Sequence, residues 1–155
     1  MGRQSFEEIL ERDGKLVYKA RGFSMKPMLH EDRDLVVIVP PASRLKPLDV
    51  AFYRRDGKYV LHRVISVSAE SYDIRGDNTY CLEHIPDTDV IGVLSAFVRG
   101  GKVIPVTDKI YQRYVRFWCG IYPMRLLYFK SVQKLKKLSR AAGLTPLLKK
   151  LIRHG

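Results

Sequence analysis

Three short stretches of the chain carry side chains that together could hydrolyse an amide bond. Ser24 lies in residues 22–27, where a glycine lets the backbone turn sharply and a Lys-Pro pair disfavours helical geometry. His62 follows in a β-branched stretch, and the acidic turn Gly76-Asp77-Asn78 begins 14 residues after it. Amide hydrolysis needs a nucleophile, a base that accepts its proton, and donors for the oxyanion. These residues therefore predict Ser24 as the nucleophile and His62 as the base.

The position of His62 in its stretch has two interpretations. Strand alternation places it on the same face as Val60 and Val64, with Arg63 on the opposite face. A histidine on an apolar face is commonly a packed core residue, just as a serine in a turn is commonly a capping residue. The occurrence of all three stretches together favours catalysis. In that case the Ser24 hydroxyl is expected to lie within about 3–4 Å of a ring nitrogen of His62.

These stretches resemble the catalytic core of the S24/S26 serine peptidases, in particular the branch of type I signal peptidases that uses a Ser-His pair. Residues 22–27 correspond to the Ser-Met-x-Pro box of that family, and residues 61–64 correspond to its His-Arg-Val box. Gly76-Asp77-Asn78 is similar to its Gly-Asp-Asn turn, and the likeness covers roughly residues 20–100. The resemblance implies a fold like that of signal peptidase and the LexA peptidase.

The resemblance also implies a role for each residue of the site. Ser24 would be the nucleophile, with its own backbone amide contributing to the oxyanion hole, and His62 would replace the family's general-base lysine. Glu83, six residues after Asp77, occupies the register of the catalytic acid. Structural support of the site would come from Gly76, Asp77 and Asn78.

The implied function is a serine endopeptidase of signal-peptidase type that cleaves an extended peptide or a precursor protein through a Ser-His dyad. The alternative is a catalytically silent module with the same fold, which binds a peptide or leader segment without cutting it. Cys81 and Cys119 have no metal-ligand spacing, and neither do the acidic residues around Glu83. We therefore expect neither a metal nor a cofactor.

Turn residues and apolar stretches predict a mainly β, antiparallel domain behind a short N-terminal helix. Ser5 and Glu8 form a capping-box pattern ahead of a helix over residues 6–12. The Asp56-Gly57 pair marks a hairpin between two β-branched stretches. The expected strands are residues 16–20, 35–39, 49–53, 58–67, 72–75, 90–98 and 102–106.

The remainder of the chain is basic and has a helical pattern. Apolar residues recur at helical spacing from Ile110, with a break expected at Pro123 and a last short helix over residues 147–152. Residues 1–100 contain 15 Lys/Arg and 15 Asp/Glu, so the net charge of +12 comes entirely from the rest of the chain. We therefore expect a peptidase-like domain over residues 1–106 and a basic amphipathic helical tail over residues 107–155.

This tail has three interpretations. It could lie on an anionic membrane surface through its aromatic and leucine side chains, with the lysines adding electrostatic attraction. It could instead cap the sheet and present a solvated basic face. Nucleic-acid phosphates would attract the same charges, but the chain contains no nucleic-acid-binding motif, and we do not expect a nucleic-acid partner.

Targeting signals are missing from the sequence. No stretch approaches the roughly 18–20 apolar residues of a membrane span, and no apolar region follows the N-terminal residues as in a secretory signal. Two widely separated cysteines are typical of a reducing compartment. We therefore expect a cytoplasmic protein, with peripheral membrane association through the tail as the open question.

Overall fold

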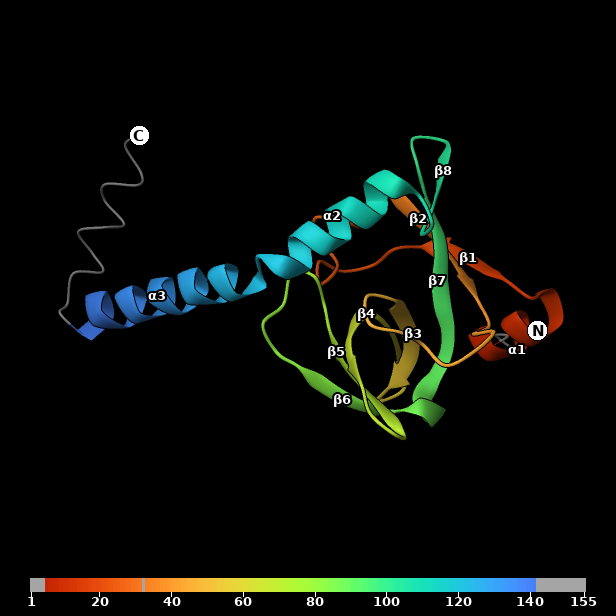
Figure 1. Cartoon of the computed structure of the whole chain (residues 1–155), viewed down its shortest axis with the longest axis horizontal. Coiled ribbons are helices and arrows are strands. Elements are labelled where there is room, and N and C mark those ends of the chain that lie inside the picture. The colour runs from red at the N-terminus through yellow and green to blue at the C-terminus, as the bar shows by residue number, and fades with distance from the viewer. Residues whose placement is uncertain (1–4, 32, 142–155) are drawn as a thin grey trace. The chain divides into compact units, whose positions relative to one another are not determined.

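The computed structural model describes residues 5–31 and 33–141, and an antiparallel β-sheet that curls on itself forms its main part (Figure 1). The strand order is β1-β2-β7-β3-β4-β5-β6, with β8 paired to β7. The strands are β1 Leu16–Lys19, β2 Asp34–Val39, β3 Val50–Arg55, β4 Lys58–Val67, β5 Ser71–Arg75, β6 Glu83–Pro86, β7 Val90–Arg99 and β8 Lys102–Pro105. The predicted mainly β, antiparallel class is confirmed, and β6 is an additional strand.

The helices lie at the two ends of the described chain. Helix α1 (Phe6–Asp13) begins with the predicted capping box, in which the Ser5 side chain accepts from the Glu8 amide and the Glu8 carboxylate accepts from the Ser5 amide. A short 3-10 turn, η1 (Asp87–Asp89), precedes β7. Helices α2 (Lys109–Gly120) and α3 (Tyr122–Ala141) follow the sheet, as expected for the tail.

Strand β4 is covered on both faces, which explains why four consecutive residues of it are buried. On one face, Val64 packs into the hydrophobic core that lines the inside of the curled sheet. The other members of that core are Leu45, Ala51, Tyr53, Tyr72, Ile74 and Ile85. On the opposite face, Arg63 is completely buried beneath the segment that carries Ser24 and beneath α2. The predicted alternation along β4 is therefore present, although neither face is solvated.

The Arg63 guanidinium joins distant parts of the chain. It donates to both carboxylate oxygens of Asp77, with Nε–Oδ1 and Nη2–Oδ2 distances of 2.7 Å. It also donates to the Leu48 carbonyl at 2.8 Å and to the Met28 sulfur at 3.0 Å. Its contact with the Tyr111 hydroxyl is 3.4 Å. One buried cation thus holds the serine segment, the Gly-Asp-Asn turn and α2 against β4.

Helix α2 belongs mainly to the same compact unit as the sheet, which extends to Trp118. The Asp108 carboxylate caps the helix by accepting from the amides of Ile110 and Tyr111, both at 2.9 Å. Tyr111 and Val115 are buried, and the Trp118 indole donates to the Asp77 carbonyl at 2.9 Å. The domain boundary that we predicted after residue 106 lies before α2. The compact unit of the structure extends to Trp118 and so includes most of that helix.

Helix α3 belongs to the second compact unit. The break expected at Pro123 falls at Ile121, because proline fits the first turn of a helix, where its missing N–H needs no acceptor. Within the described residues, no helix combines the length and the apolar character needed to cross a membrane. The short helix predicted over residues 147–152 lies outside the described part of the chain.

Removing the Asp77 carboxylate is expected to destabilise the fold strongly, because it would leave the buried Arg63 cation unpaired. We expect Asp77→Ala to lower the free energy of unfolding by about 3–5 kcal/mol in urea denaturation at pH 7. Asp87→Ala is the matched control, since Asp87 makes the same two-pronged contact with Arg44 at the surface. Solvent screens that exposed pair, so its loss should be much smaller. Equal losses in the two variants would contradict the central role of Arg63.

Candidate active site

Ser24 lies in the turn that follows β1, and two backbone features fix its position. Gly22 adopts a φ of +81°, which other residues rarely reach, and so allows the chain to turn just before the serine. The Ser24 carbonyl accepts a 2.7 Å hydrogen bond from the amide of Asn78, and the Asn78 side chain donates to the Phe23 carbonyl at 3.3 Å. The predicted serine turn and Gly-Asp-Asn turn are therefore in direct contact.

Gly76 allows this contact because nothing larger than hydrogen fits there. A Cβ atom built at Gly76 would lie 2.7 Å from the Ser24 carbonyl oxygen and 3.0 Å from the Ser24 Cβ. The first distance is too short for a real side chain, and that obstacle is rigid backbone, while the second would be a tight contact. Three contacts surround the serine turn. Gly76 approaches the Ser24 backbone closely, Asn78 donates a hydrogen bond to the Ser24 carbonyl, and Asp77 accepts from the buried Arg63.

His62 is buried in β4, with only 5% of its surface exposed, and one side of its ring is anchored. Its Nδ1 lies 3.1 Å from the Tyr53 hydroxyl and 3.6 Å from Oε1 of Glu83. Tyr53 donates its single proton to Oε2 of Glu83 at 2.8 Å. The Tyr53 oxygen must then accept from Nδ1–H, which leaves Nε2 as the ring nitrogen with a free lone pair.

Glu83 meets the histidine from β6. The side chain is partly exposed and is also paired with Arg55. Tyr53 and Arg55 were not predicted as site residues, although the hairpin register contained the signal for Tyr53. The β3–β4 pairing sets Ala51 opposite His62 and Tyr53 opposite Val60, so Tyr53 is a diagonal neighbour of the histidine on the same face.

The protonation states of this group follow from burial and charge. Burial lowers the pKa of His62, and the Glu83 carboxylate offsets only part of that effect. Burial alone would raise the pKa of Glu83, but hydrogen bonds from Arg55 and Tyr53 hold it below its usual range. Burial and the hydrogen bond to Glu83 raise the pKa of Tyr53. At neutral pH the group is a neutral imidazole, a protonated phenol and a carboxylate.

The direct contact expected between Ser24 and His62 is not formed as a hydrogen bond in the described part of the chain. Gly76 neighbours both residues. Arg63 pairs with Arg75 at the end of the β4–β5 ladder, so His62 and Gly76 are the next residues on the two strands. Gly76 in turn touches Ser24.

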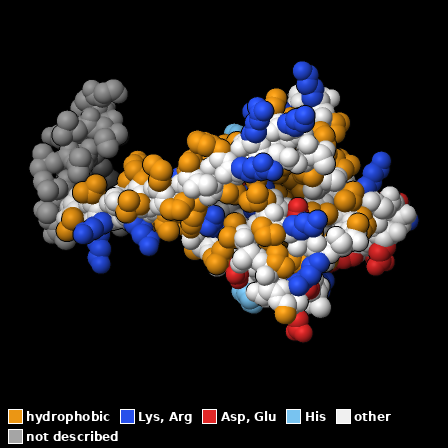
Figure 2. Space-filling view, viewed as in Figure 1, with side chains coloured by type: hydrophobic (Ala, Val, Ile, Leu, Met, Phe, Trp, Pro, Cys, Tyr) orange, Lys and Arg blue, Asp and Glu red, His pale blue; other side chains and the backbone are white. Residues whose placement is uncertain are grey.

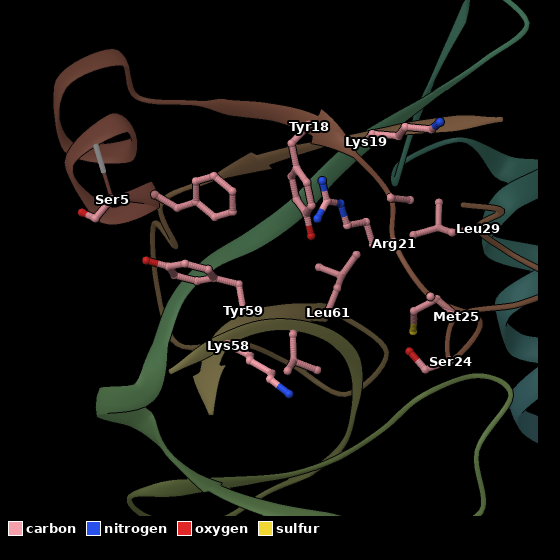
Figure 3. A pocket seen from close by; sticks show the side chains of 14 residues that line it. Ser5, Tyr18, Lys19, Arg21, Ser24, Met25, Leu29, Lys58, Tyr59 and Leu61 are labelled. Carbon is pink, nitrogen blue, oxygen red and sulfur yellow. The ribbon is translucent and has the colours of Figure 1, made fainter. Parts of the chain in front are cut away.

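Two further features bear on chemistry at Ser24. Its backbone amide donates to no acceptor among the described residues, and it is therefore available to an oxyanion. The Ser24 side chain lines a groove of about 780 Å³ (Figure 3), whose walls include Val60 and Leu61, the two residues before His62. Within the described chain, no three His, Cys, Asp or Glu side chains are grouped as metal ligands.

The sequence was compared with family models and with curated proteins. No family model and no curated protein matches the chain.

The pKa of His62 provides a test of this arrangement. We expect its imidazole to titrate below the ordinary value of 6.5 when followed by NMR, because burial disfavours the charged ring. Glu83→Gln should lower that pKa further, since the negative charge that favours the imidazolium is removed. Glu70→Gln, at an exposed position outside the site, is the control and should leave it unchanged.

The same shift has a consequence for stability. Below about pH 6.5 the unfolded chain takes up a proton at this histidine before the folded chain does. The His62 contribution to folding stability should therefore fall as pH drops through that value and become constant below the folded-state pKa. A His62 ring that titrates above 6.5 in the folded protein would contradict the described environment.

Proposed function

We propose that this chain is a serine endopeptidase of signal-peptidase type, with the S24/S26 peptidase fold, that cleaves an extended peptide or precursor protein. The observation that carries the proposal is the anchoring of His62 by Tyr53 and Glu83. It leaves a neutral imidazole with a free Nε2, in a site where Ser24 is held by a dedicated backbone contact. The Glu83 carboxylate beside Nδ1 also supplies a counter-charge for an imidazolium.

In this mechanism the substrate carbonyl lies over Ser24 and the histidine moves protons. Ser24 Oγ forms a bond to the carbonyl carbon while its proton passes to Nε2 of His62. The backbone amide of Ser24 donates to the oxyanion. The imidazolium is stabilised by Glu83, whose carboxylate lies 3.6 Å from Nδ1.

The rest of the cycle uses the same groups. His62 gives its proton to the leaving amine as the C–N bond breaks, which leaves an acyl ester on Ser24. Water then attacks the ester, and His62 accepts the proton of the water and returns a proton to Ser24. Ser24 and His62 must come closer when substrate binds, because no hydrogen bond joins them in the free protein.

Loss of either catalytic residue should abolish turnover without unfolding the domain. We expect Ser24→Ala and His62→Gln each to lower kcat by several orders of magnitude, because they remove members of one catalytic unit. Ser5→Ala, which alters another serine at the edge of the same groove, should retain activity. Cleavage can be measured with quenched peptides and labelling of Ser24 with a fluorophosphonate probe. Full turnover by Ser24→Ala would refute the proposal.

A catalytically silent peptide-binding module is the second candidate, and the missing hydrogen bond between Ser24 and His62 favours it. Such a module would bind peptide in the groove with equal affinity in the wild type and in Ser24→Ala. It would also take no label from the serine-directed probe. Labelling that depends on both Ser24 and His62 would exclude it.

The proposed peptidase acts in the cytoplasm at an anionic membrane surface, which it reaches through α3. Met124, Leu127, Tyr128, Leu135 and Leu138 recur at helical spacing, and each is more than half exposed. Residues 122–141 include six Lys or Arg and no acidic residue. Hydrophobic side chains follow the length of this helix, and Lys and Arg side chains lie mainly along its lower edge in Figure 2. Tyr111 and Val115 of α2 are buried, so the capping interpretation accounts for α2.

Membrane association can be tested with the full-length protein and vesicles. It should bind vesicles that contain phosphatidylserine, release them as salt increases, and bind neutral vesicles much more weakly. Replacing Lys130, Lys134 and Lys137 by Gln should weaken binding, since each cation near the surface contributes about 1 kcal/mol. The matched control replaces Lys15, Lys46 and Lys102. Equal binding of the two triple variants would contradict a specific role for α3.

A further inference from the structure

The groove beside Ser24 has cations on its edges that the proposed reaction does not use. Its lining includes Lys19 at the end of β1, Arg21 in the following turn and Lys58 at the start of β4. All three side chains are exposed, and the lining contains no acidic residue. Figure 3 shows Arg21 and Lys58 on opposite sides of the groove that leads to Ser24. An extended segment entering this groove would pass between positive charges.

The far end of the groove is aromatic. The ring of Phe6 from α1 lies 5.4 Å from that of Tyr18 and 4.6 Å from that of Tyr59, measured between ring centroids. Burial raises the pKa of Tyr18 to about 12, so this phenol stays neutral. The groove therefore combines an apolar end, which can hold a side chain by contact, with cations that can hold a carboxylate.

Among the described residues, no carboxylate pairs with Arg21 or Lys58. Glu7, which neighbours the groove, accepts from the Tyr59 hydroxyl at 2.6 Å and lies 3.8 Å from Arg54. Within the described residues, neither Arg21 nor Lys58 forms an ion pair. The sheet domain as a whole is close to electroneutral, since residues 1–100 contain equal numbers of basic and acidic residues. The positive groove is thus a local feature and not part of a general basic surface.

We propose that Arg21 and Lys58 select peptide substrates that carry an acidic side chain close to the cleavage point. This inference rests on the proposed peptidase function and defines the substrate class of the same groove. A guanidinium can hold a carboxylate through two parallel hydrogen bonds, and an ammonium adds a point charge from the opposite side. A basic segment would instead meet like charges, so the groove also discriminates against it.

The experiment compares pairs of extended peptides that contain Glu or Gln at single positions next to an alanine cleavage point. The wild type should prefer the Glu peptide by about tenfold in kcat/KM at low salt, because two exposed ion pairs contribute modestly. The preference should shrink as salt screens the charges. Arg21→Glu/Lys58→Glu should remove it and favour the matching Lys peptide. Lys102→Glu, on the distant β8 hairpin, is the charge-matched control and should behave like the wild type.

Binding separates failure of this inference from failure of the peptidase proposal. In Ser24→Ala protein, fluorescence anisotropy reports peptide affinity without turnover, and the Glu peptide should again bind more tightly. If no peptide is cleaved by the wild type but this binding preference persists, the peptidase proposal fails and the charge selection stands. If peptides are cleaved or bound with the same preference in the wild type and in Arg21→Glu/Lys58→Glu, the charge selection is refuted.

Discussion

The pairing of Arg63 with Asp77 is the constraint on which the site depends. A fully buried guanidinium is tolerated only when its donors are satisfied, and here they are shared among segments far apart in sequence. Two of its partners are Asp77, which belongs to the Gly-Asp-Asn turn, and Met28, which belongs to the segment that follows the serine. The requirement to satisfy one cation therefore assembles the parts that surround Ser24.

Strand alternation then directs Arg63 and His62 to opposite faces of β4. Arg63 faces the structural side of β4, whereas His62 faces the inside of the curled sheet and meets Tyr53 and Glu83. The interior lowers the pKa of the imidazole, and the partners of Glu83 keep the carboxylate charged. A neutral imidazole and a charged carboxylate beside it are thus obtained from the same low-dielectric environment.

Local patterns predicted the elements, and long-range contacts limited what could be predicted of the site. The capping box at Ser5 and the Asp56-Gly57 hairpin are local, so the helix and the β3–β4 pair could be read directly. The contacts of Ser24 with Asn78 and of His62 with Glu83 join residues far apart in the chain, and no local pattern predicts them. Arg55 was missed because its partner Glu83 lies on β6, a short strand without an apolar run. The packing of α2 was not predictable from local patterns, because it depends on a contact between Tyr111 and Arg63, which lie 48 residues apart in the chain.

The contact between Gly76 and Ser24 has a consequence for sequences that descend from a common ancestor with this chain. Any side chain at position 76 would push against the serine carbonyl, so an alanine there is incompatible with the same placement of Ser24. The Arg63–Asp77 pair does not depend on this restriction, so a related chain could keep the fold after losing the glycine. The identity of the residue at position 76 can therefore report whether a related chain still places its serine in this way, even where the serine and histidine are both retained.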